Sequence, residues 1–135
     1  MSKSNLAVLG CGNIGSAIAK GLTKSGMSAN NIMLTRRKLE SLNKLTETGF
    51  QTSIDNANAV QNAEIILLTV LPSQLMDLLD DISSKLNENH LLISIVSGVS
   101  IAEIQEKIGK NIPIIRAMPN TAAVLCESMT CLSTL

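Results

Sequence analysis

Short apolar runs alternate along this chain with segments in which apolar residues recur every three or four positions. An apolar run of about four to eight residues is typical of a strand covered on both faces of a parallel sheet, whereas the longer spacing is typical of a helix packed on that sheet. The predicted strands are residues 6–9, 31–35, 50–53, 64–70, 91–96 and 112–117, and residues 129–135 are also strand-like.

The segments between these strands are predicted to be helices. They lie at residues 14–22, 39–45, 57–61 and 75–86, and a last one opens at the capping-box pattern of Ser100 and Glu103 and ends at Gly109. Pro72 is expected to end the fourth strand, and Ser73 to cap the helix that follows. The alternation predicts an α/β protein with a Rossmann-type doubly wound, mostly parallel sheet that has helices on both faces, with residues 1–135 as one domain.

Ligand sites in such a sheet lie at the carboxyl ends of the strands. Each loop that follows a predicted strand at that edge is therefore expected to face one common crevice. These loops are residues 10–15, 35–38, 70–72, 97–98 and 118–121.

Composition narrows the possible partners of this crevice. The chain of 135 residues is 45% hydrophobic with no formal net charge, and Phe50 is its single aromatic residue. Neither bulk charge nor base stacking therefore favours nucleic acid. No apolar run approaches the length of a membrane span, and the first residues lack the core of a signal peptide. We expect a cytoplasmic protein with neither a nucleic-acid nor a membrane partner.

The cysteines and the single histidine add little chemistry. Cys11, Cys126 and Cys131 are odd in number and form no C-x-x-C pair, which indicates a reducing compartment and neither a zinc site nor a disulfide framework. Cys11 is interpreted as a small filler rather than as a redox-sensing thiol. His90 is interpreted as a polar residue at a strand entrance rather than as a catalytic base.

A glycine turn directly behind the first strand carries the strongest functional signal. Gly10, Gly12 and Gly15 form a G-x-G-x-x-G pattern between a strand and a helix. The first glycine permits the tight turn, the second lets a pyrophosphate approach the backbone, and the third lets the helix pack near the sheet. The free N–H groups of that helix would face the phosphates. The alternative is an ordinary glycine-rich turn.

The residues after the second strand indicate which dinucleotide would bind. An NAD site carries Asp or Glu about 20 residues beyond the glycines, to hold the ribose 2′-hydroxyl. Here Thr35 is followed by Arg36, Arg37 and Lys38, and a guanidinium can bind a 2′-phosphate through two parallel hydrogen bonds. We therefore expect NADP(H) rather than NAD(H). The alternative is a solvated cluster of cations at a helix start.

The segment Arg116-Ala117-Met118-Pro119-Asn120-Thr121 makes a family recognisable. Together with the glycine turn, the Val70-x-Pro72 loop and residues 94–100, it closely resembles the N-terminal domain of pyrroline-5-carboxylate reductase, in order through almost the whole chain. The resemblance implies reduction of 1-pyrroline-5-carboxylate, a small imino acid, to L-proline with NADPH. Leu71 stands where the family usually has Lys, and Ala122 where it usually has Pro.

The resemblance also implies a set of cofactor-binding residues, and it identifies no catalytic residue and no metal. The pyrophosphate would lie on Gly10, Gly12, Asn13, Ile14 and Gly15, and the 2′-phosphate end on Thr35, Arg36 and Arg37. The adenosine portion would contact Asn56, Val70 and Pro72 would flank the cofactor, and the nicotinamide side would be lined by Ser97, Gly98, Met118, Pro119 and Asn120.

Members of this family carry a second, helical domain that forms the homo-oligomer and most of the imino-acid site, and these 135 residues are expected to lack it. Three interpretations stay open. The chain is the cofactor domain of such a reductase, an NADP(H)-binding domain without turnover of its own, or part of a related oxidoreductase of the β-hydroxyacid dehydrogenase type.

Overall fold

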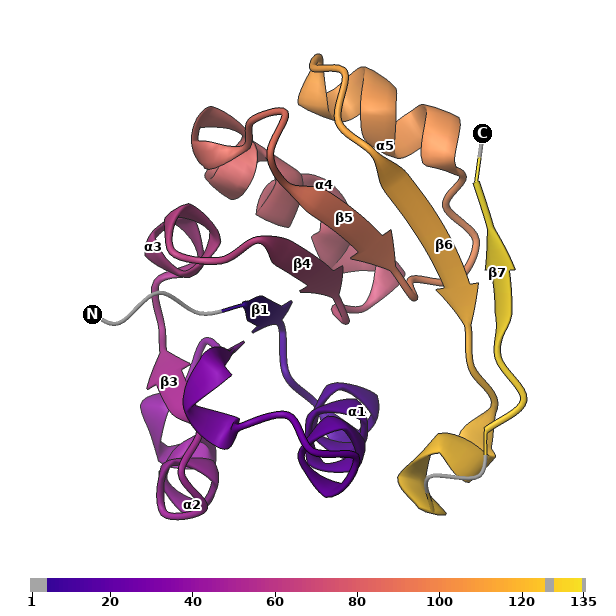
Figure 1. Ribbon diagram of the computed structural model, residues 1–135. Helices are drawn as coiled ribbons and strands as arrows, with labels where there is room; N and C mark the ends of the chain where they lie inside the picture. Colours follow the sequence, from indigo (N-terminus) through magenta and orange to yellow (C-terminus); the bar gives the residue numbers. More distant parts are fainter. Residues whose placement is uncertain (1–4, 126–127, 135) are drawn as a thin grey trace.

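The computed structural model describes residues 5–125 and 128–134, so Cys126 lies outside the described residues. Within these ranges, seven strands form one sheet in the order β3-β2-β1-β4-β5-β6-β7, and of these strands only β7 runs antiparallel to its neighbour (Figure 1). This confirms the predicted α/β class and its mostly parallel sheet. The strands are β1 (Leu6–Leu9), β2 (Ile32–Thr35), β3 (Gln51–Ser53), β4 (Ile65–Leu68), β5 (Leu91–Ser94), β6 (Ile114–Met118) and β7 (Cys131–Ser133).

Helices cover both faces of the sheet (Figure 1). The α-helices are α1 (Asn13–Lys24), α2 (Asn43–Thr46), α3 (Asn56–Gln61), α4 (Pro72–Ile82) and α5 (Ile101–Ile108). Short 3₁₀ turns complete the connections: η1 (Ala29–Asn31), η2 (Leu39–Ser41), η3 (Ser83–Lys85) and η4 (Thr121–Leu125).

Two apolar clusters, one on each face, explain this arrangement. Successive side chains of a strand point to opposite faces. In β1, Ala7 and Leu9 accordingly join the cluster under α3, α4 and α5, whereas Leu6 and Val8 join the cluster under α1. All four β1 side chains are buried. The central strand is therefore apolar throughout because it has no solvent-facing side.

Parallel pairing brings the ends of β1 to β6 to a common edge. β1 pairs with β2 on one side and with β4 on the other, and the registers Leu6↔Ile32 and Leu6↔Ile65 align their starts. Every loop that was predicted to face one crevice follows a strand at this carboxyl edge.

Some element boundaries differ from the prediction. β4 ends at Leu68 rather than at Val70, and Pro72 is the first residue of α4 rather than the end of the strand. Proline suits that position because the first helical N–H has no intrahelical acceptor. The Ser73 cap was wrong: Leu71 precedes the helix, and its N–H donates to Gln74 Oε1 at 3.3 Å. The helix predicted over 39–45 is divided into η2 and α2.

Two further observations concern only the described ranges. None of their helices is both long and apolar enough to cross a bilayer. No three His, Cys, Asp or Glu side chains within them gather where they could hold a metal ion.

Candidate functional site

The first glycine of the turn is required by both its backbone and its surroundings. Gly10 has φ +76°, a conformation that L side chains rarely adopt, and a Cβ placed on it would lie 2.3 Å from Val70 Cγ1. Its N–H donates to Thr35 Oγ1 at 3.3 Å, while Cys11 N–H donates to the Thr35 carbonyl at 2.8 Å. The turn is therefore packed between the ends of β2 and β4.

The second glycine leaves an open space above the start of α1. A Cβ on Gly12 would have no neighbour nearer than the Gly10 carbonyl oxygen, at 3.9 Å. Gly12 is also the N-cap of α1, which has neither a side-chain cap nor an acidic residue in its first turn. The first N–H groups of the helix are thus left for an external acceptor, and the helix dipole favours an anion there. This space and these donors fit the diphosphate of a dinucleotide.

The third glycine brings α1 close to the sheet. A Cβ on Gly15 would lie 2.9 Å from Thr69 Oγ1 and 3.1 Å from Val8 Cγ1. The Thr69 hydroxyl donates to the Leu9 carbonyl at 2.8 Å, which ties the end of β1 to the loop after β4. Thr69 was missed as a support of this turn, although it is the single polar residue in the apolar run 65–70, which was an available signal.

The cations after β2 lie on the surface beside the turn. Arg36, Arg37 and Lys38 are exposed, and the Arg36 N–H donates to the Ser53 carbonyl of β3 at 3.3 Å. Thr35, by contrast, is completely buried. The arginine side chains are therefore accessible to a ligand, whereas the Thr35 hydroxyl is enclosed by protein groups.

Asn56 reaches this same corner of the molecule from the start of α3. Its Oδ1 accepts a hydrogen bond from Thr35 Oγ1 at 2.6 Å, and its Nδ2 lies 3.4 Å from Asp81 Oδ2 of α4. The neighbouring Asp55 caps α3 by accepting from the Asn58 N–H at 2.9 Å. Gly10, Thr35 and Asn56 are thus joined by hydrogen bonds, although they are distant in sequence.

The predicted nicotinamide side is less tightly assembled. Ser97 and Gly98 are exposed in the loop after β5, and Met118 is 57% exposed at the end of β6. Asn120 is exposed too; its N–H donates to Ser128 Oγ at 3.1 Å, and its Oδ1 accepts from the Ala122 N–H. These residues share the carboxyl edge with the glycine turn, and the hydrogen bonds between Gly10, Thr35 and Asn56 do not extend to them.

The surroundings of Cys11 and His90 indicate structural rather than catalytic roles. Burial raises the pKa of the Cys11 thiol to about 11, although the positive charges of Arg36 and Lys20 act to lower it. The thiol is therefore protonated at neutral pH and is a poor nucleophile. His90 is buried, and its Nδ1 accepts from the Asn87 N–H at 3.0 Å in the turn before β5.

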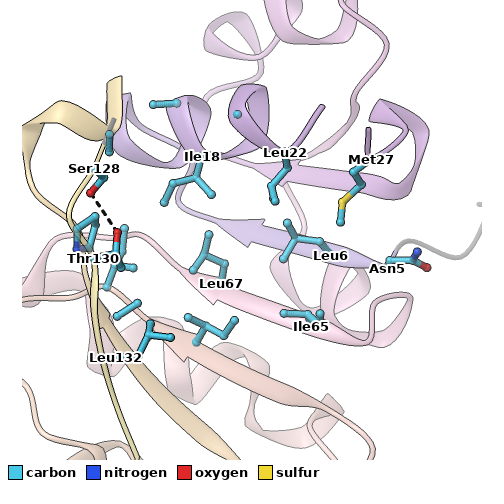
Figure 2. Close-up of a pocket in the computed structure, with 17 residues that line it drawn as sticks. Asn5, Leu6, Ile18, Leu22, Met27, Ile65, Leu67, Ser128, Thr130 and Leu132 are labelled. Carbon is cyan, nitrogen blue, oxygen red and sulfur yellow. Dashed lines mark hydrogen bonds between the residues drawn. The ribbon is translucent and has the colours of Figure 1, made fainter. Parts of the chain in front are cut away.

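A separate apolar groove runs over the sheet beside α1 (Figure 2). It has a volume of about 480 Å³ and lies between α1 and the segment that leads into β7. In Figure 2, Ile18 and Leu22 of α1 face Leu67 of β4 across it, and Leu132 lies on its other side. Of the predicted site residues, Pro119 lines this groove. The groove extends along the sheet face and does not include the glycine turn.

Comparison with known proteins agrees with this geometry. A protein-family profile described as NADP oxidoreductase, coenzyme F420-dependent, matches residues 5–98. Pyrroline-5-carboxylate reductase 1 of Dictyostelium discoideum is 48% identical over 131 residues, which are 96% of this chain and 24% of that protein.

Solved structures give the same result. A pyrroline-5-carboxylate reductase from Coxiella burnetii superposes with a TM-score of 0.93 at 33% identity, over 99% of this chain and 50% of that one. A Plasmodium falciparum pyrroline carboxylate reductase with NADP bound superposes with a TM-score of 0.85 at 25% identity, over 100% of this chain and 49% of that one.

This chain thus spans from about a quarter to half of the length of these relatives and matches their N-terminal part. The resemblance stated from residues 116–121 is confirmed. The chain belongs to the family of NADP oxidoreductases described as coenzyme F420-dependent, and its similarity within it is to the N-terminal domain of pyrroline-5-carboxylate reductases.

Proposed function

We propose that residues 1–135 form the NADP(H)-binding domain of a pyrroline-5-carboxylate reductase. The observation that carries this proposal is the open space over Gly12, where the uncapped start of α1 presents N–H groups to an anion. The relative from Plasmodium falciparum, which has NADP bound, supports the same assignment.

The exposed cations decide between the two nicotinamide dinucleotides in this proposal. Arg36 and Arg37 follow β2 where an NAD site would carry an acidic residue, and both are accessible to a 2′-phosphate. Lys38 adds a third positive charge beside them. The resulting preference is for NADPH over NADH.

The proposed reaction is the reduction of 1-pyrroline-5-carboxylate to L-proline, in which a bound NADPH supplies the hydride. The chain's own contribution is to hold the diphosphate on the glycine turn and to place the nicotinamide end near Ser97, Gly98 and Met118. The substrate site and the homo-oligomer are assigned to a further domain of the reductase. The proposed setting is the cytoplasm.

A titration tests the cofactor. Binding of NADPH and NADH to the 135-residue chain is measured by calorimetry, together with the variant in which Arg36 and Arg37 are both changed to Ala. We expect saturable binding of NADPH, weaker binding of NADH, and a selective loss of NADPH affinity in the variant. Equal affinity for both dinucleotides, or no binding, contradicts the proposal.

A second candidate is cofactor binding without turnover by these residues alone. It is favoured by the chemistry of the predicted crevice residues: apart from Lys38, which lies beside Arg36 and Arg37, none of them is Asp, Glu, His, Lys or Tyr, and the nearby Cys11 thiol is protonated. Proton transfer to an imine needs such a group or an ordered water. The test is an assay of NADPH oxidation with pyrroline-5-carboxylate: turnover by the 135 residues excludes this candidate. The similarity to reductases favours both candidates over a β-hydroxyacid dehydrogenase.

A further inference from the structure

One buried hydroxyl connects the phosphate-binding turn to the amide of Asn56. Thr35, the last residue of β2, is completely buried, and its Oγ1 lies 3.3 Å from the Gly10 nitrogen and 2.6 Å from Asn56 Oδ1. Its carbonyl oxygen also accepts from the Cys11 N–H at 2.8 Å. The main chain and the side chain of this threonine therefore both form hydrogen bonds with the turn.

The direction of each proton in this connection follows from the groups themselves. A backbone N–H only donates, so the Thr35 oxygen accepts from Gly10. The Asp81 carboxylate only accepts, so the atom of Asn56 that faces it is Nδ2, and Oδ1 faces Thr35. The single hydrogen of the Thr35 hydroxyl therefore points to Asn56 Oδ1. The orientation of an Asn amide, otherwise ambiguous, is thus determined by the network.

This orientation leaves the NH₂ group of Asn56 as the part that a ligand oxygen can reach. One of its hydrogens points toward Asp81 Oδ2, at a donor–acceptor distance of 3.4 Å, and Asn56 is only half-buried. The Thr35 hydroxyl, in contrast, already donates its only hydrogen to Asn56 Oδ1, and it is buried away from solvent. It has no hydrogen left to donate to a phosphate.

We propose that Thr35 is a positioning residue rather than a ligand: it fixes the Gly10 turn and orients Asn56 so that its NH₂ group donates to an oxygen of the ribose-phosphate end of NADP(H). The inference rests on the proposed function for the identity of the ligand. The hydrogen-bond network itself does not depend on it.

Substitutions at Asn56 separate the donor role from packing. Asn56→Asp keeps an acceptor for the Thr35 hydroxyl but replaces the outward donor with a carboxylate oxygen. We expect its NADPH dissociation constant to rise by about tenfold or more, and its melting temperature to fall, because the new carboxylate faces that of Asp81. Asn56→Ala removes the donor without adding a charge that would repel phosphates, and we expect it to lose affinity too. Unchanged NADPH affinity in Asn56→Ala overturns the inference.

Substitutions at Thr35 test the connection. Thr35→Ser retains the hydroxyl, and we expect it to bind NADPH nearly as wild type does. Thr35→Val removes the hydroxyl, and we expect a loss of about tenfold. Thr23→Val removes a hydroxyl that donates to the Lys20 carbonyl within α1; it is the matched control and leaves binding unchanged. If Thr35 acts through Asn56, the double variant of Thr35→Val and Asn56→Ala should lose less NADPH affinity than the product of the fold losses in the two single variants. A loss equal to that product would show that the two residues act independently, and it overturns the connection.

A measurement without nucleotide keeps the two proposals distinguishable. By NMR we expect slow hydrogen exchange at the Gly10 amide, and a shifted Asn56 side-chain NH₂ signal, in wild type and Thr35→Ser but not in Thr35→Val. Failure of wild type to bind NADPH would overturn the proposed function and with it the ligand of Asn56. Unchanged NMR signals in Thr35→Val would overturn the inference even where NADPH binds.

Discussion

At the residue scale, the three glycines of the turn after β1 differ in what constrains them. Gly10 is limited by its positive φ and by Val70, and Gly15 by its closeness to Thr69. Gly12 is limited by neither, because a Cβ there would meet open space. We therefore expect Gly10 and Gly15 to affect stability, and Gly12 to affect ligand binding.

Gly12→Ala should weaken NADPH binding without unfolding the protein. The new methyl group would occupy the space that the diphosphate is proposed to enter, so we expect a loss of about tenfold or more in affinity. The unfolding free energy should change by less than about 1 kcal/mol, because no protein atom is displaced. Calorimetric titration and urea denaturation measure the two quantities.

The contrasting variant is Gly10→Ala, for which we expect a loss of stability of about 2 kcal/mol or more from the strained φ and the contact with Val70. Equal destabilisation by the two substitutions would show that Gly12 also has a structural constraint.

Cys11 should make stability depend on alkaline pH. Its pKa is raised from 9.0 to about 11 in the folded protein by burial, so the unfolded chain loses this proton first as the pH rises. The stabilisation is fully present below pH 9 and is lost as the pH rises through 11, by on the order of 2 kcal/mol. Comparing urea denaturation of wild type and Cys11→Ala between pH 8 and 11 isolates this contribution. Parallel pH profiles would contradict it.

At the element scale, helix ends determine where the site can form. The N-cap residue of α1, Gly12, provides no side-chain cap. At the N-cap of α5, by contrast, Ser100 Oγ accepts from the Glu103 N–H at 3.2 Å, and Glu103 Oε2 accepts from the Ser100 N–H at 2.8 Å. Hydrogen bonds to Ser100 hold the pKa of the Glu103 carboxyl below its usual value. The start of α5 is thus satisfied by its own residues, and the start of α1 is left for a ligand.

Ser100→Ala should lower the unfolding free energy by about 1 kcal/mol through loss of the α5 cap. Ser84→Ala, at an exposed position in η3, is the control and should change stability by less than about 0.5 kcal/mol. The prediction fails if thermal and urea denaturation give the same result for both variants.

The sequence alone predicted the order and type of the main elements, because apolar periodicity reports burial directly. The capping pattern of Ser100 and Glu103 and the glycine pattern were also visible. The sequence could not predict that Pro72 starts α4, since proline is equally compatible with ending a strand and opening a helix. Nor could it reveal that Thr35 faces Asn56 rather than solvent, because that contact joins two elements through tertiary packing alone.

At the scale of the whole molecule, the two faces of the sheet are covered unequally. α3, α4 and α5 lie over one face, while α1 and α2 lie over part of the other, and the apolar groove of Figure 2 follows the remaining part. Ile93 and Ile95, which flank the end of β5, line this groove together with residues of β4 and β7. The chain therefore exposes a continuous apolar surface of the kind that binds hydrophobic probes.

This surface should bind the dye anilinonaphthalene sulfonate, and Leu132→Lys should weaken that binding. Leu132 lines the groove and is 68% exposed, so a lysine there places charge in the groove with little effect on folding. Leu125→Lys is the matched control, because Leu125 is 75% exposed but does not line the groove. Dye fluorescence that is equal in the two variants would show that the dye binds elsewhere.

The central position of β1 also determines how long this strand lacks one of its partners during translation. Its partner on one side, β2, follows closely, but its partner on the other side, β4, begins only at Ile65. A ribosome adds about 5–20 residues per second, so the nascent chain spends seconds with one edge of its apolar central strand unpaired. An unpaired edge invites pairing with another chain. The interval between residues 35 and 65 is therefore where slow translation would favour aggregation and where chaperones would be of most use.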